Sequence, residues 1–217
     1  QRFVSTKLTG KFISFEGADG VGKSTQLSLL SGDLEALGRR VILTREPGGT
    51  RLSEQIRSWV LHESDALCKQ AELLLIFAAR AQHISEVIRP ALLRGDWVLC
   101  DRFTDASYAY QGGGRGIPVG FIQQIEAVST EGMRPDLTLL LDLPVIQGIE
   151  RSVGRGQGSD RFEEQDLEFK RRVRQAYLDR QSDEPDRIRM IDATKSVESV
   201  HTQIWDLVSN LIEREDG

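Results

Sequence analysis

Cysteine and long apolar runs are both scarce in this sequence. Its 217 residues include two cysteines, Cys68 and Cys100, which are too few for the disulfide framework of a small secreted domain. No apolar run reaches the roughly 18–20 residues that a membrane-spanning helix needs, and the N-terminus lacks the apolar core of a signal peptide. We therefore expect a cytoplasmic protein with reduced thiols and no membrane partner.

An excess of basic residues is also absent. The chain has 28 lysines and arginines against 33 aspartates and glutamates, a formal net charge of −5, whereas a general nucleic-acid-binding protein usually carries a basic excess. We expect no nucleic-acid partner, and any anionic ligand must be held by local arginines. The length and the 39% hydrophobic content suit one domain over residues 11–217. Residues 1–10 are interpreted as an N-terminal extension, disordered or foreign to the natural chain.

Strand patterns alternate with helix patterns along the chain. Short runs rich in β-branched, aromatic or leucine side chains predict strands at 11–16, 41–44, 97–100, 137–143 and 187–191. Apolar residues at three- and four-residue spacing predict helices at 24–37, 52–60, 70–93 and 197–211, the third kinked or shortened at Pro90. This alternation predicts an α/β fold of about five parallel strands with helices on both faces. Ligands of such sheets bind beyond the carboxyl ends of the strands.

A phosphate-binding loop lies between the first predicted strand and the first predicted helix. Residues 17–24 read GADGVGKS and fit the pattern G-x-x-x-x-G-K-S/T, for which we expect roughly 0.006 matches by chance in a chain of this composition. Backbone N–H groups and the helix N-terminus attract phosphate oxygens. Lys23 is expected to bridge the outer phosphates of ATP, and Ser24 to hold Mg²⁺. The predicted ATP-binding residues are Gly17, Ala18, Asp19, Gly20, Val21, Gly22, Lys23, Ser24 and Thr25.

Other signals separate the classes of protein that use such a loop. An Asn-Lys-x-Asp guanine motif and a Leu-Ser-Gly-Gly-Gln signature are both absent, which disfavours a GTP switch and a transport ATPase. Asp142 ends a predicted strand without the following glutamate that a water-activating ATPase usually has. A kinase is favoured, and a nucleotide-binding regulatory ATPase is the alternative from another class.

Charged residues stand at the ends of two predicted strands. Asp101 and Arg102 directly follow the third strand and Arg45 ends the second, so all three should lie at the ligand-binding edge. The carboxylate can hold Mg²⁺ or its water, and each guanidinium can grip a phosphate through two donors. The alternative interpretation is an ion pair at the strand end that binds no ligand.

Five motifs together resemble the bacterial thymidylate kinases over residues 11 to about 215: GADGVGKST, TREPGGT, FAAR, DRFTDASYAYQGGGRG and RGQGSDRFE. The resemblance implies a P-loop NTPase fold with a mobile lid at about 151–162, transfer of the γ-phosphoryl group of MgATP to dTMP, and a homodimer. The acceptor phosphate is already anionic, so no general base is needed. The three histidines, His62, His83 and His201, lie far apart and outside the motifs. A kinase for another nucleoside monophosphate or for a deoxynucleoside is the nearest alternative.

The resemblance also assigns roles around the nucleoside of dTMP. Asp19 matches a carboxylate that accepts a hydrogen bond from the sugar 3′-hydroxyl, and Tyr110 matches an aromatic residue that crowds the 2′ position. Ser107 matches a residue near N3 of thymine, and Gln111 is a further candidate for the substrate site. Tyr110 could instead be a packing aromatic.

Base stacking is assigned to the helix at 70–89. The family stacks thymine on a phenylalanine and hydrogen-bonds its O4 to an arginine, here Phe77 and Arg80. Family members often space these two residues by four, which would put Ile76 at the stacking position. Both spacings share one helix face, and a phenylalanine on an apolar stripe can also be plain core. Arg57, on the preceding helix, is expected to be a second clamp on the dTMP phosphate.

The glycine-rich segment at 151–161 resembles the family's lid over the phosphates. One subtype of the family has an arginine in the phosphate loop where this chain has Gly20, so a lid arginine, Arg155 first, is expected to supply that charge. Glu163 resembles an acidic residue near the substrate. The predicted catalytic residues are Lys23, Asp101, Arg102, Arg151, Arg155 and Arg161.

Overall fold

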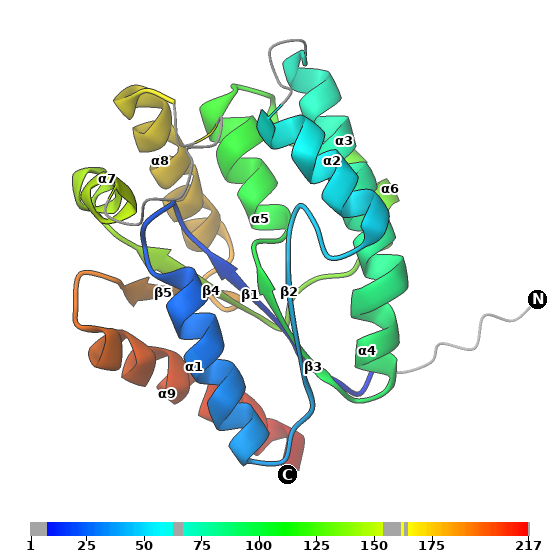
Figure 1. Cartoon of the computed structure of the whole chain (residues 1–217), viewed down its shortest axis with the longest axis vertical. Helices are drawn as coiled ribbons and strands as arrows, with labels where there is room; N and C mark the ends of the chain where they lie inside the picture. Colours follow the sequence, from blue (N-terminus) through cyan, green and yellow to red (C-terminus); the bar gives the residue numbers. More distant parts are fainter. Residues whose placement is uncertain (1–7, 63–66, 154–161, 163–164, 217) are drawn as a thin grey trace, which may run out of the picture.

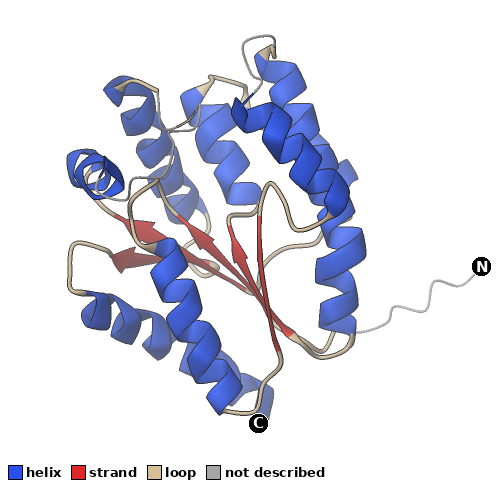
Figure 2. Cartoon of the chain, viewed as in Figure 1, coloured by secondary structure: helices blue, strands red, loops and turns tan. Residues whose placement is uncertain are grey.

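A computed structural model describes residues 8–62, 67–153, 162 and 165–216. At its centre is one five-stranded sheet in the order β2-β3-β1-β4-β5, in which every neighbouring pair is parallel (Figures 1 and 2). The strands are β1 (Phe12–Glu16), β2 (Val41–Arg45), β3 (Trp97–Asp101), β4 (Leu137–Asp142) and β5 (Ile188–Asp192). Each of the strands predicted from the sequence is therefore confirmed, with boundaries that differ by at most one residue.

Helices cover both faces of this sheet, as expected. The helical elements of the described residues are α1 (Lys23–Ala36), α2 (Arg51–His62), α3 (Lys69–His83), η2 (Ile84–Ile88), α4 (Arg89–Leu93), α5 (Thr104–Ser107), η3 (Tyr108–Gly114), α6 (Val119–Thr130), α7 (Val145–Val153), α8 (Leu167–Asp183) and α9 (Val197–Asp216). On one face, α1 and α9 lie side by side (Figure 1), and their apolar residues join those of β1 and β4 in one core cluster. On the other face, η2, α4 and α8 pack against the sheet.

The order of the strands follows from how much apolar surface each one carries. β1 is buried along its whole length and pairs with β3 and β4, so it forms the centre of the sheet. Strands at the edges are partly exposed, and β2 and β5 show this pattern. Because all strands run parallel, their carboxyl ends meet at one edge, where Glu16 and Asp101 lie close together and the phosphate loop begins.

The helix predicted over 70–93 is continuous but not regular. It runs as α3, then as the π-helical turn η2, then as α4, and Pro90 stands in the first turn of α4. Proline lacks a backbone N–H and crowds the preceding turn, so a widened turn before it fits the predicted irregularity. Residues 1–7 of the expected N-terminal extension lie outside the described residues, and at its end the Thr9 and Gly10 N–H groups donate to the Leu92 carbonyl at 3.2 and 2.9 Å.

Several helical segments have no counterpart among the sequence predictions, namely α5, η3, α6, α7 and α8. Glycines 112–114 weaken any helix prediction because glycine is a poor helix former. In the structure this stretch is held by α8, whose Arg172 side chain donates to the carbonyls of Gly113 and Gly114 at 3.3 and 3.1 Å. Within the described residues, no helix is both long and apolar enough to span a bilayer.

Candidate active site

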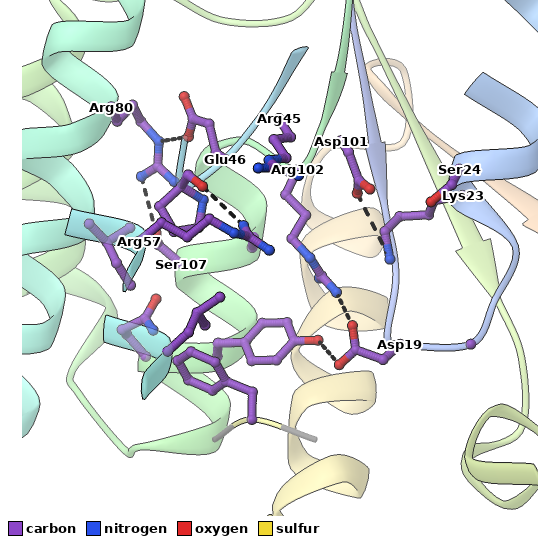
Figure 3. Close-up of a pocket in the computed structure, with 18 of the residues that line it drawn as sticks. Asp19, Lys23, Ser24, Arg45, Glu46, Arg57, Arg80, Asp101, Arg102 and Ser107 are labelled. Atoms are coloured by element: carbon purple, nitrogen blue, oxygen red, sulfur yellow. Dashed lines mark hydrogen bonds and ion pairs between the residues drawn. The ribbon is translucent and has the colours of Figure 1, made fainter. Parts of the chain in front are cut away.

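A cavity of about 380 Å³ lies at the carboxyl edge of the sheet (Figure 3). Its walls come from the phosphate loop, the turn after β2, helices α2 and α3, and the segment that follows β3. Many of the residues singled out in the sequence line it: Asp19, Gly20, Gly22, Lys23, Ser24, Arg45, Arg57, Arg80, Asp101, Arg102, Ser107, Tyr110 and Gln111. The fold thus brings together motifs that lie far apart in the chain, from the phosphate loop at 17–24 to Phe162 in the last of the five motifs.

The phosphate loop forms one end of the cavity. Lys23 begins α1, and its Nζ donates to the carbonyls of Gly17 and Ala18 at 3.2 and 3.1 Å. Burial and the nearby Arg102 guanidinium lower the pKa of Lys23. Of the other predicted loop residues, Val21 is buried in the core beneath the loop. Thr25, like Gly17, Ala18 and Val21, does not line the cavity.

Ser24 and Asp101 suit a magnesium ion that is bound together with phosphates. Both line the cavity, and Asp101 Oδ1 lies 4.0 Å from Lys23 Nζ. The same oxygen is buried and, within the described residues, has no hydrogen-bond partner. No group of three or more His, Cys, Asp or Glu side chains that could hold a metal occurs in that part of the chain. Mg²⁺ commonly binds through one or two protein ligands, waters and substrate phosphates, and this donor set fits that mode.

Arg102 links the phosphate loop to the middle of the cavity. Its backbone φ is 73°, a conformation uncommon outside glycine. One terminal nitrogen donates to the Gly17 carbonyl at 2.9 Å, and the other donates to Asp19 Oδ1 at 2.6 Å. Asp19 also accepts from the Tyr110 hydroxyl at 3.2 Å. Burial by itself raises the pKa of Asp19, but the charges of Arg102 and Lys23 and these hydrogen bonds outweigh it, and the net pKa is lowered.

A fully buried acid, Glu16, also lies near Arg102. Glu16 ends β1 and is fully buried. Its Oε1 accepts from the Phe103 N–H at 2.7 Å, and its Oε2 accepts from the Tyr177 hydroxyl at 2.8 Å. Burial, with a contribution from the nearby Asp105 charge, raises the pKa of Glu16 to about 8. The Tyr177 hydroxyl in turn accepts from Arg102 Nη1 at 3.1 Å. The Glu16–Tyr177 pair therefore helps to hold the Arg102 guanidinium in position.

The base end of the cavity, which we define by Glu46, Ile76, Arg80, Ser107 and Gln111, lies opposite the phosphate loop. Arg80 is almost completely buried. Its Nε donates to Glu46 Oε2 at 2.6 Å, and one terminal nitrogen donates to Ser107 Oγ at 3.0 Å (Figure 3). The other terminal nitrogen donates to the Phe103 carbonyl at 3.0 Å. Because Glu46 balances its charge, Arg80 is suited to a neutral carbonyl acceptor rather than to a phosphate.

The structure decides which of two neighbouring side chains faces the base end. Phe77 does not line the cavity: it is buried in a core cluster with Leu73 and Tyr108, and Arg80 Cζ lies 4.5 Å from the centre of its ring. Ile76 lines the cavity instead. Of the two candidates, Ile76, four positions before Arg80, is therefore the one that faces the cavity, and Phe77 belongs to the core. Base stacking by either residue stays a prediction.

Two arginines form the cationic wall of the cavity, on the side of β2 and α2. Arg57 Nη1 donates to the Pro47 carbonyl at 3.0 Å, after a cis Glu46–Pro47 peptide bond. Arg45 is largely exposed and donates to Glu54 Oε2 at 3.0 Å. Neither guanidinium is enclosed in the way that Arg80 is, so both can turn toward an anionic group that enters the cavity.

The side chain of Gln111 is oriented by a hydrogen bond to Glu72. Its Nε2 donates to Glu72 Oε1 at 2.8 Å, and Glu72 is also paired with Arg115. Both Gln111 and Glu72 are buried. Since Glu72 fixes the amide nitrogen, the carbonyl oxygen of Gln111 and its second N–H are the groups that can face a ligand.

Part of the predicted lid falls outside the described residues, namely Arg155, Arg161 and Glu163, and their roles stay predictions. Arg151 stands in the last turn of α7, donates to the Ala193 carbonyl at 3.0 Å and does not line the cavity. Gly20 has a φ of 82°, and a Cβ built on it would lie 2.1 Å from the Gly148 carbonyl oxygen. The close approach of α7 thus explains why the loop carries no arginine there.

Sequence reasoning missed several residues of this site. Two histidines lie near motifs, contrary to the expectation: His62 lines the cavity, and His83 contacts Glu46. Glu46 belongs to the TREPGGT motif, but nothing in the local pattern indicates its contact with Arg80. Phe162 lines the cavity and meets the Tyr110 ring edge to face at 5.3 Å. Other missed lining residues are Pro47, Leu61 and Ala106.

Comparison with known proteins agrees with this geometry. The thymidylate kinase family model matches residues 15–204. A thymidylate kinase of Pseudomonas putida (strain GB-1) is 51% identical over 208 residues, which are 95% of this chain and 99% of the relative. One from Methylococcus capsulatus is 52% identical over 203 residues, 94% of this chain and 97% of the relative. The crystal structure of thymidylate kinase from Ehrlichia chaffeensis superposes with a TM-score of 0.77 at 32% identity, covering 92% of this chain and 98% of that one. The chain belongs to the thymidylate kinase family.

Proposed function

We propose that this enzyme transfers the γ-phosphoryl group of ATP to dTMP and releases ADP and dTDP. The observation that carries the proposal is the composition of a single cavity, with a phosphate loop at one end and the charge-balanced Arg80–Glu46 pair at the other. The first end suits a triphosphate, and the second suits a neutral base with a carbonyl group.

The order of charges along the cavity sets the orientation of the two substrates. The phosphates of ATP lie at Lys23 and Ser24, and thymine lies at the base end with its O4 facing Arg80. The dTMP phosphate then falls between them, within reach of Arg45, Arg57 and Arg102, which all line the cavity. Arginine binds phosphate through two parallel donors, so these side chains can hold the acceptor in line with the γ-phosphorus.

Phosphoryl transfer in this arrangement needs no protein base. An oxygen of the dTMP phosphate forms a bond to the γ-phosphorus while the bond from that phosphorus to the β–γ bridging oxygen breaks, and ADP leaves with the electron pair. The attacking oxygen is anionic at neutral pH, so no proton has to be removed. Lys23 and Arg102 offset the charge spread over the transferring group. Ser24 and Asp101 would hold Mg²⁺ together with the phosphates, and the ion would supply further charge neutralisation.

The sugar lies between the two ends of the cavity, at Asp19 and Tyr110. Asp19 stays ionised because its pKa is lowered, and it can accept a hydrogen bond from the 3′-hydroxyl. Burial raises the pKa of the Tyr110 hydroxyl, which therefore stays protonated and donates to Asp19. Arg102 lies over the Tyr110 ring, 4.8 Å from its centre. This packing fixes the ring where a 2′-hydroxyl would meet it.

The test is coupled ADP release with a panel of acceptors: dTMP, dUMP, ribothymidine monophosphate, dCMP and AMP. We expect dTMP to give the highest kcat/KM and ribothymidine monophosphate to be a poor acceptor. A preference for AMP or for a nucleoside without phosphate would point to a different small-molecule kinase. ATP turnover that does not depend on any acceptor would point to a regulatory ATPase.

We also propose that the enzyme works as a homodimer in the cytoplasm. Helices α2, α3 and α6 pack beside one another (Figure 1). Their exposed large apolar side chains are Leu52, Trp59, Leu74, Val119, Phe121 and Val128. Exposed apolar side chains on a set of packed helices support an interface with a second copy. Both cysteines are free, and Cys68 is exposed, which suits a reducing compartment. Light scattering of the purified chain, with Phe121→Glu as the disrupting variant, tests the dimer.

A further inference from the structure

A buried histidine stands directly behind the base end of the cavity. His83 is the last residue of α3, three positions after Arg80, and its side chain is fully buried. Its Nδ1 lies 2.9 Å from Glu46 Oε1, and its Nε2 lies 2.7 Å from Thr44 Oγ1. His83 does not line the cavity, so any effect on the substrate must pass through Glu46.

The hydrogen-bonding capacity of the partners fixes the roles of the two ring nitrogens. A carboxylate can only accept, so Nδ1 of His83 donates to Glu46. Nε2 lies within hydrogen-bond distance of the Thr44 hydroxyl, which can donate to it. The second oxygen of Glu46 accepts from Arg80 Nε. Thr44, His83, Glu46 and Arg80 therefore form one chain of hydrogen bonds, in which Thr44 is partly buried and the other three are buried. Each member orients the next.

Packing also prevents the imidazole ring from turning away. Gly49 has a φ of 84°, and a Cβ built on it would lie 2.6 Å from the His83 ring and 2.7 Å from Thr44 Oγ1. The backbone of the turn after β2 thus lies directly against the ring. Only a glycine permits this approach, so the turn that carries Glu46 and the helix that carries His83 fix each other.

Arg80 ends this series of hydrogen bonds and is the residue that contacts the base in the proposed function. Three of the five N–H groups of Arg80 are used by Glu46, Ser107 and the Phe103 carbonyl. The two others, one on each terminal nitrogen, can donate into the cavity that Arg80 lines. Their direction depends on where Glu46 holds Nε, and the position of Glu46 depends on His83.

We propose that His83 is a positioning residue for base recognition: it holds Glu46, which aims Arg80 at the 4-carbonyl of the acceptor base. This inference deepens the proposed function and rests on the base lying at Arg80. It predicts that His83 controls the binding of the acceptor and the choice between a 4-carbonyl base and a 4-amino base. The binding of ATP at the far end of the cavity should not depend on it.

Two substitutions of His83 distinguish the loss of the hydrogen bond to Glu46 from the loss of the imidazole ring as a whole. In His83→Asn the amide nitrogen can occupy the place of Nδ1 and still donate to Glu46. In His83→Gln the amide lies near the place of Nε2, so the contact with Thr44 can remain and the donor to Glu46 is lost. His201→Asn is the matched control, because His201 contacts Asp33 and Gln26, away from the cavity.

Steady-state kinetics with dTMP, dCMP and ATP test the proposal. We expect His83→Gln to raise the KM for dTMP about tenfold, the size of a lost buried hydrogen bond to a charged group, and to reduce the dTMP over dCMP preference by a similar factor. His83→Asn should stay within about threefold of the wild type, and the KM for ATP should stay unchanged in both variants. Thr44→Val, which removes the donor to Nε2, should shift the KM for dTMP in the same direction by a smaller factor.

Several results would overturn this role. If His83→Gln and His83→Asn behave alike, or if dTMP and ATP are affected together in step with a fall in melting temperature, His83 is only part of the core. If His83→Gln does not fold, Thr44→Val serves as the test. An unchanged KM for dTMP in that variant would also show that His83 is only part of the core. A wrong assignment of the function would be recognised separately, because the wild-type enzyme would then not prefer dTMP over dCMP.

Discussion

Glu16 provides a prediction about stability whose size can be worked from the structure. It is fully buried at the end of β1, between the Phe103 N–H and the Tyr177 hydroxyl. Burial raises its pKa from 4.5 to about 8. Between these two pH values the folded protein holds a proton on Glu16 that the unfolded chain releases. The folded state is therefore destabilised as the pH rises through this window and loses nothing further above it.

The perturbation is Glu16→Gln, which keeps the shape of the protonated acid and cannot ionise. One pKa unit corresponds to about 1.4 kcal/mol, so the wild type should lose about 5 kcal/mol relative to Glu16→Gln between pH 4.5 and pH 8. Near the lower limit the two proteins should be similar in stability. Near the upper limit the variant should be clearly the more stable one.

Urea unfolding of both proteins, at several pH values between about 5 and about 8, measures this difference. Glu54→Gln is the matched control. Glu54 has a lowered pKa, so whatever it contributes is present above its ordinary pKa and is lost only as the pH falls below it. Its difference from the wild type should therefore be constant over this range. A Glu16→Gln difference that is equally constant, or that shrinks as the pH rises, would refute the reasoning.

Three further predictions concern activity. Lys23→Met should abolish phosphoryl transfer while the melting temperature stays close to the wild type, because the polar partners of Nζ within the described residues are two loop carbonyls and Asp101; measurable turnover near the wild-type rate contradicts its assignment. Asp19→Ala should raise the KM for dTMP far more than that for ATP in initial-rate assays, and equal changes would place its partner elsewhere. Phe77→Ala should lower the free energy of unfolding by about 3–5 kcal/mol, whereas Ile76→Ala should be the variant that raises the KM for dTMP. The reverse pattern in the KM values would return the base contact to Phe77.

The sequence by itself determined the sheet and the phosphate-binding end of the site. Both depend on local signals: apolar runs with period two or three to four, and a loop motif whose residues are contiguous. Strand ends could be placed to within one residue, and the carboxyl ends of parallel strands share one edge. Asp101, Arg102 and Arg45 could therefore be assigned to the site from the order of residues alone.

Helices α6 and α8 were not predicted, because their apolar residues follow the helical period only weakly. Helix α7 is strongly amphipathic, but it is short and has Gly148 in its middle. The segment η3 contains three glycines and forms only because α8 packs against it and Arg172 binds its last carbonyls. Tertiary contacts of this kind override intrinsic propensity.

Only the tertiary structure decided the base end. Ile76 and Phe77 are adjacent and both apolar, so their identity does not reveal which one faces a cavity and which one faces α6 and η3. Glu46 and His83 are 37 positions apart, and nothing in either local sequence shows that they meet. Contacts between distant residues depend on how helices and turns pack across the whole fold. Periodicity and motifs report on local conformation, and the hydrogen-bond chain behind Arg80 arises from packing between elements.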